Sequence, residues 1–367
     1  MYSQTDLDEA VAAGAVSAEA AKALRSFVDL QRATPAVDEE QFRLITGFND
    51  IFVSIASAIL LFAVGWIGQS IGQSTGLVFD HDGPSPLAPA AVAATAWGLA
   101  LFFTAKRRMA LPSILLLLAF VGGVFATSML SVGVVLGIAP FEDNDRVMGI
   151  VVAASAAIAA GAAFLHWSRF KVPITIAAGA AAVAGIAVGL LRGSLGDIAN
   201  FQQILLGFVL LLGIGVFLFA MRWDSSDTAR VTRRSDVAFW LHLLAAPMIV
   251  HPIFTLLGLN DGTATIGEGV IVIALYIALG VTALAIDRRA LLVSALAYVL
   301  WSLSNLFKQF GAVELNIALT ALVIGSALLL LSAFWHQARA AIVRPLPENL
   351  RARLPVTERR VSPQPAA

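Results

Sequence analysis

The sequence predicts an all-α, polytopic integral membrane protein, and two observations carry this prediction. Only 13% of its 367 residues are charged and 59% are hydrophobic, whereas about 25% of the residues in a soluble globular domain are charged. The apolar residues also fall into long charge-free runs, and a helix needs about 20 such residues to cross a bilayer. A soluble globular fold is therefore excluded.

Ten charge-free runs are long enough to cross a membrane, so we predict about ten transmembrane helices arranged as hairpins. They are Ile51–Phe79, Gly83–Ala105, Met109–Phe141, Val147–Ser168, Val172–Leu191, Ile198–Met221, Val237–Asn260, Gly269–Ile286, Ala290–Phe307 and Leu315–Ala338. The third run is the longest, and it fits either one long tilted helix or a helix followed by a re-entrant piece.

Basic residues are distributed unevenly between the two sides of such an array. When the loops are assigned alternately, all 24 Lys and Arg residues except Arg146, Arg192 and Lys308 fall on one side. Cytoplasmic loops are enriched in basic residues, so both termini are predicted to be cytoplasmic. An odd number of spans would destroy this alternation.

Three regions are predicted along the chain: a cytoplasmic helical segment over residues 1–49, a transmembrane domain over residues 50–338, and a disordered, basic, proline-rich cytoplasmic tail over residues 339–367. In the first region, Gly14 suits the end of one helix and Ser17 the start of another, which predicts a helical hairpin within residues 1–34. Its apolar stripe is too thin for an independent core, so we expect it to dock on another surface, with a cytoplasmic protein as the candidate partner.

Two neighbouring runs, Val147–Ser168 and Val172–Leu191, consist largely of Ala and Gly. The second contains Gly185 and Gly189 in GxxxG spacing. Small residues let helix backbones approach closely in lipid, so these two helices are predicted to pack tightly.

The run Val237–Asn260 carries two histidines, His242 and His251, and two internal prolines, Pro247 and Pro252. Each proline removes a backbone donor, which predicts a helix that is kinked or opened near its middle. His251 lies deeper in the run and is a candidate for proton relay or ligand contact, and the alternative is a histidine bonded to a nearby carbonyl. At about 100° per residue the two imidazoles fall on opposite faces, which argues against a shared metal site.

Glu268 lies between two glycines at the start of the next helix. Its carboxylate either pairs with His251 across the hairpin or is simply stabilised by the helix dipole. The candidate intramembrane polar site therefore consists of His251, Glu268, Pro247, Pro252 and His242.

Other chemistry finds little support in the sequence. Cysteine is absent, which excludes thiolate metal sites and cysteine nucleophiles. The acidic loops at residues 80–82 and 142–145 match no EF-hand, and no phosphate-binding, dinucleotide-binding or metalloprotease motif occurs. We therefore predict no metal, no cofactor and no nucleic-acid partner, and expect the lipid bilayer as the main partner.

The segment LDEAVAAGAVSAEAAKALRSFV, with its Gly-x-x-Ser turn, precedes a long array of short-looped hydrophobic hairpins. In this plan the chain resembles uncharacterised bacterial multi-pass membrane proteins that are grouped only as domains of unknown function. The resemblance implies a location in the bacterial cytoplasmic (inner) membrane. It implies no catalytic or binding residues.

For function, the sequence favours a carrier or channel for a small solute, because a proline-interrupted helix with an interior histidine is typical of such proteins. The alternative is a non-catalytic membrane scaffold or regulatory subunit that docks a cytoplasmic partner. An enzyme is less favoured, since only His251 and Glu268 offer convergent titratable groups. The solute and the oligomeric state are left open.

Overall fold

The structure of the protein is a computed structural model. It describes residues 11–24, 48–79, 83–137, 144–196, 198–228, 230, 232–258, 266–289, 291–292, 296, 300, 304 and 316–355. Throughout these residues the regular structure is helical, with no strand, which confirms the predicted all-α class.

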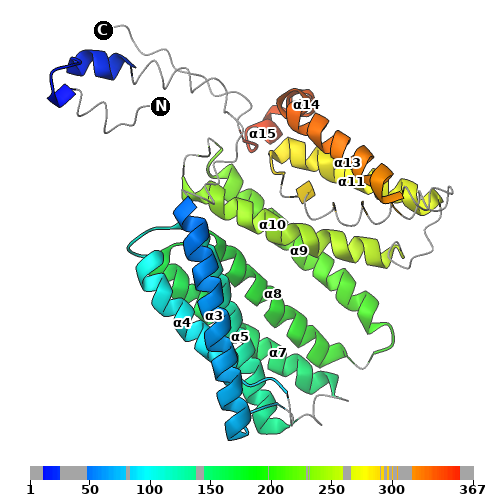
Figure 1. Ribbon diagram of the computed structural model, residues 1–367. Helices are drawn as coiled ribbons and strands as arrows, with labels where there is room; N and C mark the ends of the chain where they lie inside the picture. The colour runs from blue at the N-terminus through cyan, green and yellow to red at the C-terminus, as the bar shows by residue number, and fades with distance from the viewer. Residues whose placement is uncertain are drawn as a thin grey trace. The chain divides into compact units, whose positions relative to one another are not determined.

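The larger of two compact units contains all of the long helices. They are α3 (Phe48–Thr75), α4 (Leu87–Phe103), α5 (Ala110–Leu136), α7 (Asp145–Phe170), α8 (Ile174–Leu195), α9 (Phe201–Ser225), α10 (Arg233–Leu256), α11 (Ile266–Ile286), α13 (Asn316–Ala333), α14 (Trp335–Val343) and the short α15 (Glu348–Arg351). Successive helices form antiparallel hairpins, of which α7 with α8 and α9 with α10 are the most extensively packed pairs (Figure 1).

Six of the described helices are long and apolar enough to cross a membrane: α3, α5, α7, α8, α9 and α10. The protein is therefore an all-α membrane protein, but the predicted count of ten spans is not reached. An apolar run fixes only the greatest length that a helix can have, and several helices end before their run does. At 1.5 Å per residue, the 17 residues of α4 extend about 26 Å, short of a hydrocarbon core of about 30 Å.

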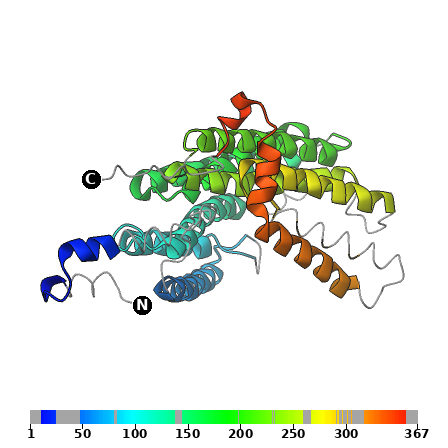
Figure 2. The ribbon, with the colours of Figure 1, turned by 90° about the horizontal axis from the view of Figure 1, so that it is seen from above.

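The described residues of the other predicted runs add no further straight spanning helix. In the described part of α11, the continuous apolar helix is Ile273–Ile286, which is too short to count as a span. The last run is divided between α13 and α14, which meet at an angle of 72° and would add a seventh span if counted together (Figure 2). Most of the run Ala290–Phe307 lies outside the described residues. By contrast, the long third run forms the single helix α5 over its described part, without a re-entrant piece.

Glycines allow the backbones of α7 and α8 to meet. A Cβ atom added at Gly149 of α7 would lie 2.2 Å from the amide nitrogen of Gly193 and 2.5 Å from the carbonyl oxygen of Gly189. A Cβ atom at Gly189 would lie 2.6 Å from the amide nitrogen of Ala153. The close packing predicted from the GxxxG spacing is confirmed, and the glycine series on α8 extends from Gly185 through Gly189 to Gly193.

The far ends of α7 and α8 are joined by an ion pair between Asp145 and Arg192, with 2.6 Å between the Arg192 guanidinium and the carboxylate. The two side chains are 33% and 45% exposed, so water competes for both charges. We expect Arg192→Ala to lower the free energy of unfolding by less than about 1 kcal/mol. Denaturant unfolding of the wild type and the variant in the same detergent would measure this; a loss of several kcal/mol would contradict it.

Helix α10 lies between other elements and is half buried. Its apolar face contributes to three hydrophobic clusters: Leu241 packs with α8 and α9, Ala246 with α11 and Trp335, and Val250 with α11. The helix continues through both prolines, so of the two predicted forms, kinked or opened, the opened one is not found. Each proline removes only one backbone donor, and close packing supports the segment: a Cβ at Gly213 of α9 would lie 2.9 Å from the Met248 carbonyl carbon.

The C-terminal segment departs from the predicted disorder over its first part. Arg339 and Val343 of α14 are buried, and a guanidinium nitrogen of Arg339 donates a hydrogen bond to the Pro355 carbonyl oxygen at 2.6 Å. The composition of residues 339–355 is basic and proline-rich, but these tertiary contacts order them. Residues 356–367 lie outside the described part of the chain.

Residues 11–24 belong to the second compact unit and are described by themselves. Gly14 has a φ of +70° and ends the first helical stretch, and the Ser17 hydroxyl accepts a hydrogen bond from the Ala20 amide at 3.1 Å. Both turn features predicted from the sequence are therefore present. The rest of the predicted hairpin lies outside the described residues.

Candidate functional site

The candidate site is a charged cluster formed by Asp224, Arg230, Asp287 and Arg288. The end of α11 places two of these residues. The Arg288 amide donates to the Ala283 carbonyl and the Asp287 amide to the Leu284 carbonyl, while Asp287 has a φ of +56°. This is the Schellman motif, which normally uses glycine at the left-handed position; aspartate tolerates that conformation better than most residues. The sharp turn directs two adjacent, oppositely charged side chains toward the α9–α10 hairpin.

Asp224, in the last turn of α9, binds two partners from different helices. Its carboxylate accepts two hydrogen bonds from the Arg288 guanidinium, one of them from Nε at 3.1 Å. It also lies 3.0 Å from Nε2 of His242 on α10. The Asp224 and Arg288 residues are each only 1% exposed, and His242 is fully buried. This part of the cluster is therefore a desolvated ion pair with a histidine attached.

The Arg288 guanidinium has a second set of partners at the start of α10. It donates to the Ser235 carbonyl at 3.0 Å and to the Ser235 hydroxyl at 3.2 Å. One arginine thus joins the end of α11 to both helices of the α9–α10 hairpin.

At Asp287 the charges are reversed: the carboxylate lies at the end of α11, and its arginine partner lies in the α9–α10 connection. Arg230, in the α9–α10 connection, donates to the Asp287 carboxylate at 2.7 Å and to the Asp287 carbonyl at 2.7 Å. The indole of Trp335 donates to the other carboxylate oxygen at 2.7 Å, and Nε of Arg339 lies 3.8 Å away. Each side of the cluster therefore contributes one carboxylate and one arginine: Asp224 pairs with Arg288, and Arg230 pairs with Asp287.

The α9–α10 connection is itself fixed by hydrogen bonds. The Asp227 carboxylate accepts from both the amide and the hydroxyl of Thr232, at 2.8 and 2.7 Å. Thr232 in turn caps α10 by accepting from the Arg234 amide. These contacts hold Arg230, which has a φ of +54°, in the position from which it reaches Asp287.

Among the described residues singled out from the sequence, only His242 contacts this cluster, through Asp224. His251 is exposed on the opposite side of α10, as the helical spacing predicts, and its carbonyl accepts a hydrogen bond from the Thr255 hydroxyl. Pro247 is exposed and Pro252 is buried. The Glu268 side chain lies outside the described part of the structure, so its predicted pairing with His251 stays a prediction.

Sequence reasoning missed the four charged residues of the cluster because they lie at the ends of apolar runs. There, arginines are explained equally well by the positive-inside rule. A signal was nevertheless present: Asp224 and Asp287 are acidic residues that lie next to arginines just after an apolar run. Such a carboxylate neutralises the basic turn locally and indicates a paired rather than a solvated arginine.

A second buried histidine was also missed. His166 of α7 is fully buried, and its Nδ1 lies 3.2 Å from the Thr175 hydroxyl on α8. Its ring packs among Trp97, Phe120 and Phe170, with centroid distances of 6.3, 6.1 and 4.6 Å. The aromatic packing joins α4, α5 and α7, and this histidine is far in sequence from the charged cluster.

The chemistry of the charged cluster follows from its composition. Arginine stays protonated, so each guanidinium supplies a fixed positive charge that matches a carboxylate. Within the described residues no group of three or more His, Asp or Glu side chains could hold a metal ion. The arrangement therefore joins the end of α11 to the α9–α10 hairpin by ionic contacts.

Comparisons with protein-family models, with curated proteins and with solved structures found no match to this chain.

Proposed function

We propose that this protein is a carrier for a small solute in a cell membrane, and that the charged cluster is the gate at one end of its helices. The observation that carries the proposal is the pair of oppositely oriented ion pairs between the α9–α10 hairpin and the end of α11. Two ion pairs, Asp224 with Arg288 and Arg230 with Asp287, cross the same boundary between helices.

The energetics of a buried ion pair suit a contact that opens better than a contact that stays closed. Burying a charge incurs a large desolvation penalty, so a buried ion pair often stabilises a protein no more than apolar side chains of the same size. When the pair separates into water, however, both charges regain hydration, whereas separated apolar surfaces do not. A charged boundary is thus better suited to repeated opening toward water.

The packing of the helices also supports a division into two groups, the α9–α10 hairpin and α11 with α14. The α9–α10 hairpin is packed along its length, and α11 contacts α14. Between these groups, Ala246 and Val250 of α10 belong to apolar clusters that also include residues of α11. Movement of one group against the other is a common mechanism of alternating access.

The positive-inside rule assigns the gate to the cytoplasmic side, since the cluster lies in two of the basic turns. Both termini then face the cytoplasm as well. This orientation belongs to the proposal, and the labelling experiment below tests it together with the gate.

Ala246 provides the test, because it is buried one turn beyond His242 along α10 and the native chain has no cysteine. Ala246→Cys would be treated with a membrane-impermeant thiol reagent in intact cells and in inside-out vesicles. We expect slow labelling from the cytoplasmic side while the gate is closed. Adding Asp287→Arg, which places like charge beside Arg230 and Arg339, should increase that labelling several-fold. Exchanging the charges in Arg230→Asp with Asp287→Arg should restore protection.

Two exposed positions control for sidedness: Ser226→Cys at the basic end should label only in inside-out vesicles, and Ser74→Cys near the end of α3 only in intact cells. Protection of the thiol introduced by Ala246→Cys from both sides, in every variant, would contradict the carrier. It would favour the second candidate, a scaffold or regulatory subunit. The observation behind that candidate is that residues 11–24 form a capped turn and belong to the second compact unit.

A further inference from the structure

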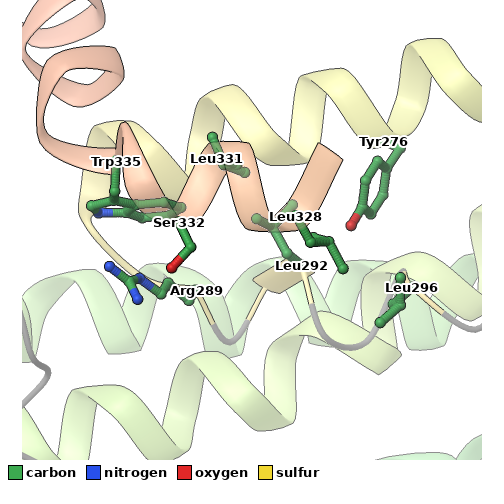
Figure 3. Close-up of a pocket in the computed structure, with 8 residues that line it drawn as sticks. All are labelled: Tyr276, Arg289, Leu292, Leu296, Leu328, Leu331, Ser332 and Trp335. Atoms are coloured by element: carbon green, nitrogen blue, oxygen red, sulfur yellow. The ribbon is translucent and has the colours of Figure 1, made fainter. Parts of the chain in front are cut away.

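A pocket of about 140 Å³ lies beside the charged cluster, between α11, α13 and the residues that follow α11 (Figure 3). Four of its eight lining residues are leucines, and a cationic and a hydroxyl side chain lie at one end near the start of α14. The lining residues are Tyr276, Arg289, Leu292, Leu296, Leu328, Leu331, Ser332 and Trp335.

Arg289 differs from the other arginines around it. Arg288, Arg230 and Arg339 all bind or approach carboxylates. Arg289 instead stacks on Trp335, with its guanidinium carbon 4.8 Å from the ring centroid, and it has no carboxylate partner in the part of the chain that the structure describes. Its positive charge is half buried at the mouth of an apolar pocket, where an anion would be favoured.

The pocket extends from this cation along the apolar part of the helices. Arg289 lies toward one end of the lining, and Tyr276 of α11 lies toward the other (Figure 3). Leu328 and Leu331 line the opposite wall from α13 (Figure 3). Its volume is close to that of an engineered apolar cavity of about 150 Å³ that binds benzene, so a segment of hydrocarbon chain fits it.

We infer that this pocket binds an anionic phospholipid, with the phosphate on Arg289 and part of one acyl chain between the leucines. The hydroxyl of Ser332 lies at the same end as Arg289 and can donate to a phosphate or ester oxygen (Figure 3). Neither feature suffices alone: a soluble anion leaves the apolar wall empty, and a neutral lipid leaves the Arg289 charge uncompensated. This site does not depend on the proposed carrier activity.

Native mass spectrometry of the full-length protein in detergent, titrated with phosphatidylglycerol or phosphatidylcholine, would test the inference. We expect one phosphatidylglycerol to bind in preference to phosphatidylcholine. Arg289→Gln should weaken that binding roughly tenfold or more, as for loss of a charge-assisted hydrogen bond, while Arg289→Lys should retain most of it. The matched control is Arg234→Gln, an exposed arginine at the start of α10 that does not line the pocket.

A second variant tests the apolar wall without changing any charge. Leu331→Phe adds volume within the pocket and should also weaken phosphatidylglycerol binding, with an unchanged elution profile showing that the fold is intact. Equal binding of the two lipids by the wild type would overturn the inference. So would unaltered phosphatidylglycerol binding in both Arg289→Gln and Leu331→Phe.

Discussion

Arg288→Ala is expected to lower the free energy of unfolding by about 3–5 kcal/mol, the largest effect of any single change at the charged cluster. Asp224 would then lie in a buried position beside the His242 imidazole, without the positive charge of Arg288. Removing one partner of a buried ion pair is far more damaging than removing both, because the remaining charge cannot regain its hydration. SDS-induced unfolding in mixed micelles would measure the change.

Two variants separate this explanation from a general effect of shortening a side chain. Arg289→Ala removes the neighbouring arginine, which has no carboxylate partner among the described residues, and should change the free energy of unfolding by less than about 1.5 kcal/mol. The double variant Asp224→Asn with Arg288→Gln removes both charges and leaves amides that can still bond to His242. It should be more stable than Arg288→Ala; equal or lower stability would show that the unpaired charge is not the cause.

Gly149→Ala is expected to destabilise the α7–α8 hairpin by about 1–3 kcal/mol, although only one methyl group is added. The new Cβ atom would lie 2.2 Å from a backbone nitrogen of α8, and a backbone cannot move aside as a flexible side chain can. The two helices would have to separate along a contact that also includes Gly189 and Ala153. Their loss of van der Waals contact matters because packing is a main source of helix association in lipid.

Gly161→Ala on the same helix provides the matched control. A Cβ atom at Gly161 would meet nothing within 4 Å among the described residues, so this substitution should be neutral or slightly stabilising through helix propensity. Both variants would be compared by the same SDS unfolding measurement. If Gly149→Ala proved as stable as Gly161→Ala, the close approach of α7 and α8 would be ruled out as a source of stability.

The membrane class, the helical hairpins and the close pairing of α7 with α8 could all be predicted from the sequence. Each of these depends on local properties: the length of an apolar run, the charge of the turn beside it, or glycines at four-residue spacing. The turn at Gly14 and the cap at Ser17 were predictable for the same reason. The number of complete spans was not, because where a helix ends or bends depends on its neighbours, as at the junction of α13 with α14.

The charged cluster could be identified only from the tertiary structure. Asp224 and Arg288 are 64 residues apart, and no local pattern tells a buried, paired arginine from a basic residue that faces the cytoplasm. The sequence drew attention to His251 by its depth in an apolar run, yet the fold exposes His251 and buries His242. Apolar composition by itself determined that this chain enters a membrane, because the free energy of transfer from water to lipid depends on how much apolar surface is transferred. Which charges meet within it was decided by packing, since ion pairing requires specific atoms to lie a few ångströms apart.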